Sequence, residues 1–131
     1  IVTLGSITGT VRVVAEQLRA KGQKVGILKI RYMRPFPEKE IMELSKKVKA
    51  IGVIDKDISF GYEGTIFTNV NSALAKANAS VFKKNFIGGL GGRDITKAEI
   101  EQMYNDLFAG ISSNQQQKTV EFFNLKVETN D

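Results

Sequence analysis

Apolar runs alternate with helical patterns along the whole chain. Short, nearly continuous apolar stretches indicate strands that are buried on both faces. These stretches are residues 1–5, 24–31, 50–55 and 82–88. Apolar residues at helical spacing follow each of them, in residues 10–22, 37–48, 65–78 and 96–110. Strands that alternate with helices predict right-handed crossovers and an α/β fold with a mostly parallel sheet covered on both faces.

Individual residues support the helix ends. Gly22 lies where the first helix should stop, and Pro37 suits the first turn of the second. Thr96 and Glu99 have the spacing of a capping box, which predicts the start of the last helix. Gly110 is predicted to end it.

The C-terminal part has a different composition. Residues 111–118 are polar and are predicted to be a linker, whereas residues 119–127 form an apolar tail. The tail either adds an edge strand or docks on a neighbour. We therefore expect a domain over residues 1–112, followed by a linker and tail over 113–131. Because the chain opens on a strand pattern without Met, we expect it to be cut from a longer polypeptide.

Composition limits the chemistry. The 131 residues are 42% hydrophobic, which suits one domain with its own core. The chain contains no Cys and no His, so it can form no disulfide, cysteine-ligated cluster or Ser–His relay. No apolar run approaches the ~18 residues of a membrane span. We expect a cytoplasmic protein that contacts no membrane and performs no demanding catalysis unaided.

The net charge of +5 is unevenly distributed. Residues 1–50 hold 11 Lys and Arg against 4 Asp and Glu, whereas residues 97–131 hold 3 against 6. A basic half can attract nucleic acid or phosphate. The lysines at 46, 47 and 49 also suit the end of a helix, where cations complement the dipole. No aromatic residues alternate with them, so we expect no nucleic-acid partner.

The loops that follow the strands should share the carboxyl edge of the sheet, where open parallel sheets bind ligands and partners. One of them places four glycines within residues 88–92. Gly91 and Gly92, with Arg93 beside them, would suit an anion cradle before a helix. However, the loop lacks the Lys-Ser/Thr of a P-loop, and Asp94 would repel phosphate. A tight corner with glycine at positive φ is the favoured interpretation.

The segment "RYMRPFP" is a second candidate at this edge. Pro35 and Pro37 flank Phe36 and hold it in an extended segment. Arg31 and Arg34 have the chemistry to hold carboxylates of a neighbouring domain. Phe36 belongs either to that interface or to a staple between the next helix and the sheet.

Asp55 and Asp57, in the loop after the third strand, invite a metal interpretation. Two carboxylates without the remaining ligands of a calcium loop do not form such a site, so we expect no metal. Asp57 remains a candidate contact residue at the loop edge.

Four stretches together resemble a known family. "GSITGT", "LRAKGQKVGILKIRYMRPFP", "VIDKDISFGYEGTIFTNV" and "FIGGLGGRDIT" resemble the α chain of pyruvate:ferredoxin oxidoreductase and its 2-oxoacid relatives, in order, over about residues 1–110. The match is to the transketolase C-terminal-like second domain. The resemblance implies a three-layer α/β/α fold with parallel strands in the order 24–31, 1–5, 50–55, 82–88. An antiparallel strand of the wider fold, beside 24–31, would precede residue 1.

The resemblance also implies a function for the whole enzyme. It would decarboxylate a 2-oxo acid on thiamine diphosphate with magnesium, pass electrons through iron–sulfur clusters to ferredoxin, and transfer the acyl group to coenzyme A. The family's catalytic and cofactor-binding residues lie on other domains or subunits, so none can be carried onto this chain. We expect a non-catalytic assembly domain. The alternative is a stand-alone anion- or nucleotide-binding module that uses residues 88–94.

Overall fold

The computed structural model describes residues 1–56, 63–89, 94–113 and 120–122. Along the chain the elements are β1 (Val2–Leu4), α1 (Ile7–Ala20), β2 (Leu28–Ile30), α2 (Glu38–Ser45), β3 (Ala50–Asp55), α3 (Thr65–Lys76), β4 (Phe82–Ile87), α4 (Lys97–Ser113) and β5 (Val120–Phe122). None of the helices in these ranges is both long and apolar enough to cross a membrane.

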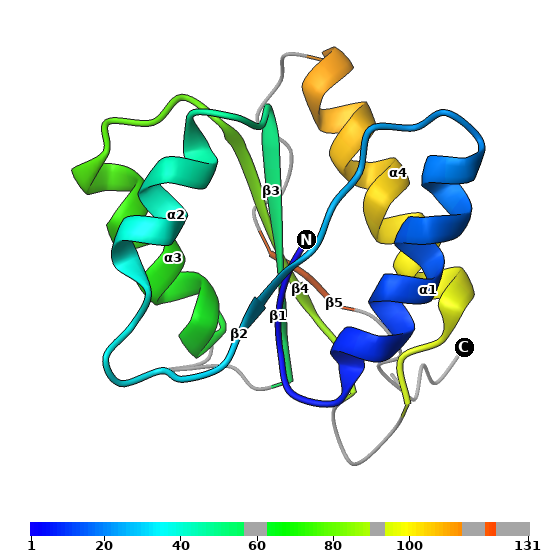
Figure 1. Ribbon diagram of the computed structural model, residues 1–131, viewed down its shortest axis with the longest axis horizontal. Helices are drawn as coiled ribbons and strands as arrows, with labels where there is room; N and C mark the ends of the chain where they lie inside the picture. Colours follow the sequence, from blue (N-terminus) through cyan, green and yellow to red (C-terminus); the bar gives the residue numbers. More distant parts are fainter. Residues whose placement is uncertain (57–62, 90–93, 114–119, 123–131) are drawn as a thin grey trace, which may run out of the picture.

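The strands form a five-stranded sheet in the order β2-β1-β3-β4-β5, and every pairing is parallel. Helices α2 and α3 cover one face, and α1 and α4 cover the other (Figure 1). The three-layer α/β/α architecture and the predicted order of the first four strands are therefore confirmed. The C-terminal tail contributes the edge strand β5, which was one of the two alternatives left open.

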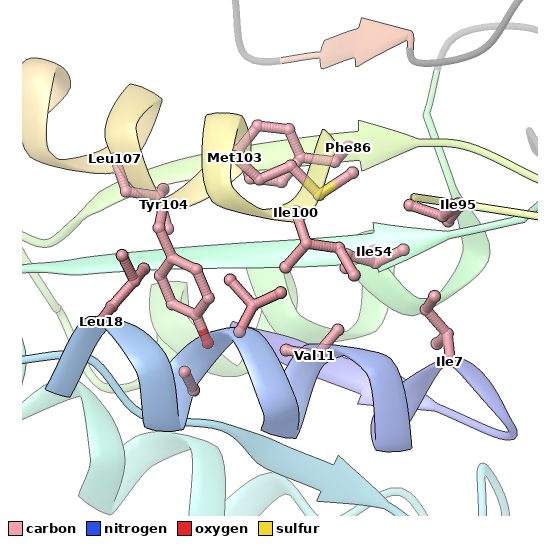
Figure 2. Packing of buried hydrophobic residues seen from close by; sticks show 12 residues of the cluster. Ile7, Val11, Leu18, Ile54, Phe86, Ile95, Ile100, Met103, Tyr104 and Leu107 are labelled. Carbon is pink, nitrogen blue, oxygen red and sulfur yellow. The ribbon is translucent and has the colours of Figure 1, made fainter. Parts of the chain in front are cut away.

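Each face of the sheet has its own hydrophobic core. The core under α1 and α4 includes Ile54 and Phe86 of the sheet, and Figure 2 shows Met103 of α4 lying against the Phe86 ring. The core under α2 and α3 includes Val53 and Phe67. Strand β3 alternates its side chains between the two cores, with Ile51 and Val53 in one and Ile54 in the other, as expected for a strand covered on both sides.

Helix α1 begins at Ile7, three residues before the predicted start at residue 10, so most of the stretch between the first predicted strand and helix is helical. The Thr8 hydroxyl donates to the Gly5 carbonyl oxygen at 2.8 Å and lies 2.8 Å from the Thr3 hydroxyl of β1. These bonds hold the first turn against the sheet without a side-chain cap from Ser6. At the other end, Gly22 has φ +86° and its N–H bonds Arg19, so the predicted stop is confirmed.

Two other helix ends differ from the prediction. Pro37 precedes α2 instead of occupying its first turn, with ψ 64°, and α2 ends at Ser45. Helix α4 continues through Gly110 to Ser113, so Gly110 does not end it. A Cβ on Gly110 would stand 2.2 Å from the Phe82 ring, which explains the glycine as a close-packing position. The capping box is confirmed, because Thr96 and Glu99 exchange backbone-to-side-chain bonds of 2.9 and 3.1 Å.

An ion pair attaches β5 to the sheet. Lys84 of β4 is 5% exposed, and its Nζ lies 2.7 Å from a carboxylate oxygen of Glu121. The same ammonium lies 5.8 Å from the centre of the Phe86 ring. Among the described residues, the charged partner of this buried cation is Glu121, which the pairing of β5 with β4 brings to it.

We expect Glu121→Gln to lower the free energy of unfolding by about 1–2 kcal/mol, because a buried ammonium loses its counter-ion while Glu121 itself is partly exposed. Lys84→Met should change it by less than about 1 kcal/mol, since an apolar chain of similar length replaces the charge. Urea unfolding of the 131-residue chain measures both. Glu38→Gln, which removes an exposed pair with Lys76, is the matched control and should have little effect. Equal losses from Glu121→Gln and Glu38→Gln would contradict this account.

Candidate functional site

The carboxyl ends of the strands, at one edge of the sheet, were predicted to carry the candidate residues. The structure places a buried polar network there, between the ends of β3 and β4 and the start of α3. Asp55, at the end of β3, is 1% exposed, and Asn85 of β4 is fully buried. Buried polar groups are stable only when they are hydrogen-bonded, so the partners of these two side chains define the site.

The Asp55 carboxylate caps α3. One oxygen accepts the Ile66 N–H at 2.8 Å, and the other accepts the Phe67 N–H at 3.1 Å and the Asn85 amide at 2.9 Å. A carboxylate at this position also complements the positive end of the helix dipole. The start of α3 is therefore occupied by the protein's own anion. The metal interpretation of Asp55 is replaced by a structural role.

Asn85 completes the network. Its side-chain oxygen accepts the Gly64 N–H at 2.8 Å, and its NH₂ group donates to the Val53 carbonyl oxygen at 3.1 Å as well as to Asp55. Sequence reasoning missed this residue. The available signal was an Asn in the middle of an otherwise buried strand, which demands a buried partner.

Gly64 allows the network to form. A Cβ at this position would lie 2.1 Å from the Asp55 carboxyl carbon and from one of its oxygens. Gly64 has φ −77°, so close approach and not backbone conformation requires the glycine. The network holds Gly64 and the start of α3 against the ends of β3 and β4.

The segment after β2 lies at the same edge of the sheet and contains both exposed and half-buried side chains. Met33 and Phe36 are half-buried against the core under α2 and α3. Arg31 and Arg34 are exposed, as the prediction of a contact surface requires. The packing of Phe36 agrees with the staple interpretation. The bond between Arg34 and Pro35 is cis.

The remaining predicted residues, Asp57, Gly91, Gly92 and Arg93, lie outside the described residues. The described start of the glycine loop is a corner: Gly88 donates its N–H to the Asp55 carbonyl oxygen at 3.0 Å, and Gly89 has φ +72°. Gly89 therefore has a positive φ, a backbone conformation that favours glycine. The predictions for Gly91 and Gly92 stay predictions.

A hydrophobic groove lies at the opposite, amino edge of the sheet and was not anticipated. Its volume is about 630 Å³, and it is lined by β1, β2 and the second half of α4, with Lys24, Lys47 and Lys49 among its lining residues. Tyr104 lines it and donates its hydroxyl to the Gly26 carbonyl oxygen at 2.8 Å. Burial raises the pKa of Tyr104 well above its usual value, so the hydroxyl remains a donor. Lys47 and Lys49 follow the end of α2 at Ser45, where positive charge complements the helix dipole.

The side chains present do not fit the cofactors that the family resemblance implies. Iron–sulfur clusters need thiolates, and the sequence has no Cys. No group of three or more acidic side chains that could hold a metal occurs within the described ranges. At α3, the helix end that could receive a diphosphate is filled by Asp55.

Comparison with known proteins supports the resemblance. The sequence model for the pyruvate:ferredoxin oxidoreductase core domain II matches residues 1–100. A ketoisovalerate oxidoreductase subunit VorA of Pyrococcus abyssi is 42% identical over 123 residues, which are 94% of this chain and 31% of that protein. The pyruvate synthase subunit PorA of Methanothermobacter thermautotrophicus is 42% identical over 103 residues, 79% of this chain and 26% of that protein. The chain thus spans about a third of these relatives or less. It belongs to the pyruvate:ferredoxin oxidoreductase core domain II family.

Proposed function

We propose that this chain is a non-catalytic structural and assembly domain of a 2-oxoacid:ferredoxin oxidoreductase that depends on thiamine diphosphate. One observation carries the proposal: the chain belongs to a core-domain family of such enzymes, yet it contains no Cys and no His, and its described residues include no group of three or more acidic side chains that could hold a metal. The buried polar side chains Asp55 and Asn85 are used for internal capping and not for a reactive site.

The substrate class is a 2-oxo acid. Relatives of similar identity are named for ketoisovalerate and for pyruvate, so the chain itself does not select between the two. Selectivity then belongs to residues outside this chain. Thiamine diphosphate, magnesium, the iron–sulfur clusters and coenzyme A would be held by other domains or subunits, and together they supply decarboxylation, electron transfer and acyl transfer.

The partners are the remaining domains and subunits, with ferredoxin contacting the whole complex. The carboxyl edge supports this role because Arg31 and Arg34 are exposed there on a segment anchored by Met33 and Phe36. The lysines at the amino edge match the helix ends, so the positive charge calls for no nucleic acid and no membrane. A cytoplasmic location fits these partners.

We expect the isolated 131-residue chain to fold but to show no pyruvate- or ketoisovalerate-dependent reduction of viologen, even with thiamine diphosphate, magnesium and coenzyme A. The reason is that the chain has no Cys and no His with which to bind an iron–sulfur cluster. The complete oxidoreductase assayed in parallel is the positive control. Turnover by the chain alone would contradict the proposal.

The same preparation tests the alternative of a stand-alone anion-binding module. Titration with pyrophosphate, thiamine diphosphate and coenzyme A, followed by calorimetry, should give no saturable binding. Tight binding would favour a module that uses residues 88–94.

A further inference from the structure

Tyr32 is the most exposed large hydrophobic side chain among the described residues. It is 72% exposed, whereas Val13 and Phe108 are 37% and 36% exposed. A tyrosine ring buries some 150–250 Å² when it is covered, so this exposure leaves much apolar area in contact with water. One exposed ring alone is ordinary on a protein surface, and its surroundings decide whether it has a role.

The segment that carries Tyr32 is anchored to the fold by two residues, one on each side of Arg34 in the sequence. Met33 and Phe36 pack against the core under α2 and α3. The Phe36 carbonyl oxygen accepts the Glu38 N–H at 2.8 Å, which joins the segment to α2. Glu38 in turn pairs with Lys76 of α3 at 3.1 Å. Because the backbone is already held, a partner that binds Tyr32 loses little free energy to ordering it.

Tyr32 has positively charged neighbours in the sequence. Arg31 and Arg34 are both exposed, and neither guanidinium has an ion pair or hydrogen bond with any side chain that the structure describes. The next acidic residue along the chain, Glu38, is already paired with Lys76. Tyrosine and arginine are the residue types most enriched at the energetic centres of protein interfaces.

We propose that Arg31, Tyr32 and Arg34 form a docking knob that inserts into a carboxylate-lined pocket on another subunit of the oxidoreductase. This inference rests on the proposed function. Because the Tyr32 side chain is 72% exposed, the knob would supply the ring and its partner the surface that covers it. Carboxylates there would bind the two guanidinium groups in bidentate pairs while the ring fills the pocket.

The first test measures association of the full-length subunit that contains this chain with its partner subunits, by sedimentation at increasing dilution. We expect Tyr32→Ala to weaken association about tenfold or more, and Tyr32→Phe to retain most of it because the ring remains. Arg31→Glu and Arg34→Glu should weaken it further. Val13→Ala, on the exposed side of α1, is the matched control and should have no effect.

Melting of the isolated 131-residue chain separates docking from folding. The Tyr32→Ala chain should melt within a degree or two of the parent, because an exposed ring contributes little to the fold. A drop in its melting temperature as large as that of the whole complex would overturn the proposal.

The second test identifies the partner surface. A photoreactive p-azidophenylalanine at position 32 should cross-link the assembled enzyme to another subunit, at a peptide that contains Asp or Glu next to the attachment point. The same group at position 13 should give no such product. Cross-links within the same polypeptide, to nucleic acid, or to a peptide without acidic residues would overturn the inference. The proposed function would survive that result, because it fails only if the isolated chain turns over or the parent subunit forms no oxidoreductase.

Discussion

Replacement of Gly64 by alanine is expected to remove a large part of the domain's stability. The new Cβ would stand 2.1 Å from the Asp55 carboxyl group, on a side chain that is 1% exposed and cannot move into solvent. Overpacking a core costs about 1–3 kcal/mol. Displacing Asp55 also leaves the first N–H groups of α3 without their acceptor, at roughly 1–3 kcal/mol for each buried group. The sum is a large fraction of a typical total stability of about 5–15 kcal/mol.

Urea unfolding of the 131-residue chain, followed by far-ultraviolet circular dichroism, measures this loss. Gly9→Ala is the control, because Gly9 lies in α1 and a Cβ there has no atom within 4 Å. It should stabilise the chain by up to about 1 kcal/mol, the usual gain of alanine over glycine inside a helix. A Gly64→Ala chain that unfolds at the parent's urea midpoint would refute the close-approach explanation.

Asp55→Asn is expected to cost about 2–4 kcal/mol although it conserves the shape of the side chain. Among the described residues, the carboxylate accepts hydrogen bonds from the Ile66 and Phe67 N–H groups of α3 and from Asn85. An amide has only one oxygen, so its NH₂ group must face at least one N–H donor that is also buried. Such a donor keeps no partner and loses its hydration, and the charge at the start of the helix is lost as well.

The control for Asp55→Asn is Asp106→Asn on α4, where the carboxylate accepts an exposed bond from Gln102 at 2.8 Å. Its effect should stay within about 0.5 kcal/mol. A double-mutant cycle with Asn85→Ala should show strong coupling between positions 55 and 85, since both belong to one network. Additive losses would mean that the two side chains act independently and that the network does not explain the effect of Asp55→Asn.

How far the sequence predicts this structure depends on how local each cause is. The helix stop at Gly22 and the capping box of Thr96 and Glu99 involve residues a few positions apart, and both are confirmed. The alternation of apolar runs with helical spacing predicted the layers and, with the family resemblance, the strand order. Helix starts were less certain, because Thr8 and Gly9 resemble loop residues until the Thr3 hydroxyl of β1 is placed beside Thr8.

The errors and omissions have a common cause in long-range contacts. Gly110 looks like a helix stop in the sequence, and only the Phe82 ring, 28 positions away, explains why the helix passes through it. The capping role of Asp55 was missed because only the fold brings Asn85 and the start of α3 to it. Tyr32 was not predicted as a contact residue, because its exposure depends on which neighbouring side chains are buried. The order of residue types along the chain indicates which secondary structure each segment prefers. The roles of these residues depend instead on contacts with segments far away in the sequence.

Strand β1 lies between β2 and β3 in the sheet, which has a consequence for synthesis on the ribosome. Of the described strands it is synthesised before its two neighbours, and it pairs with β2 on one side, at Val2–Leu4 and Leu28–Ile30, and with β3 on the other. The edge of β1 that pairs with β3 therefore has no partner strand until residues around 53 have left the ribosome. Any shortened version that starts after Leu4 would lack the strand that joins β2 to β3, so β2 would be separated from β3, β4 and β5. Expression boundaries for this domain should therefore not fall inside β1.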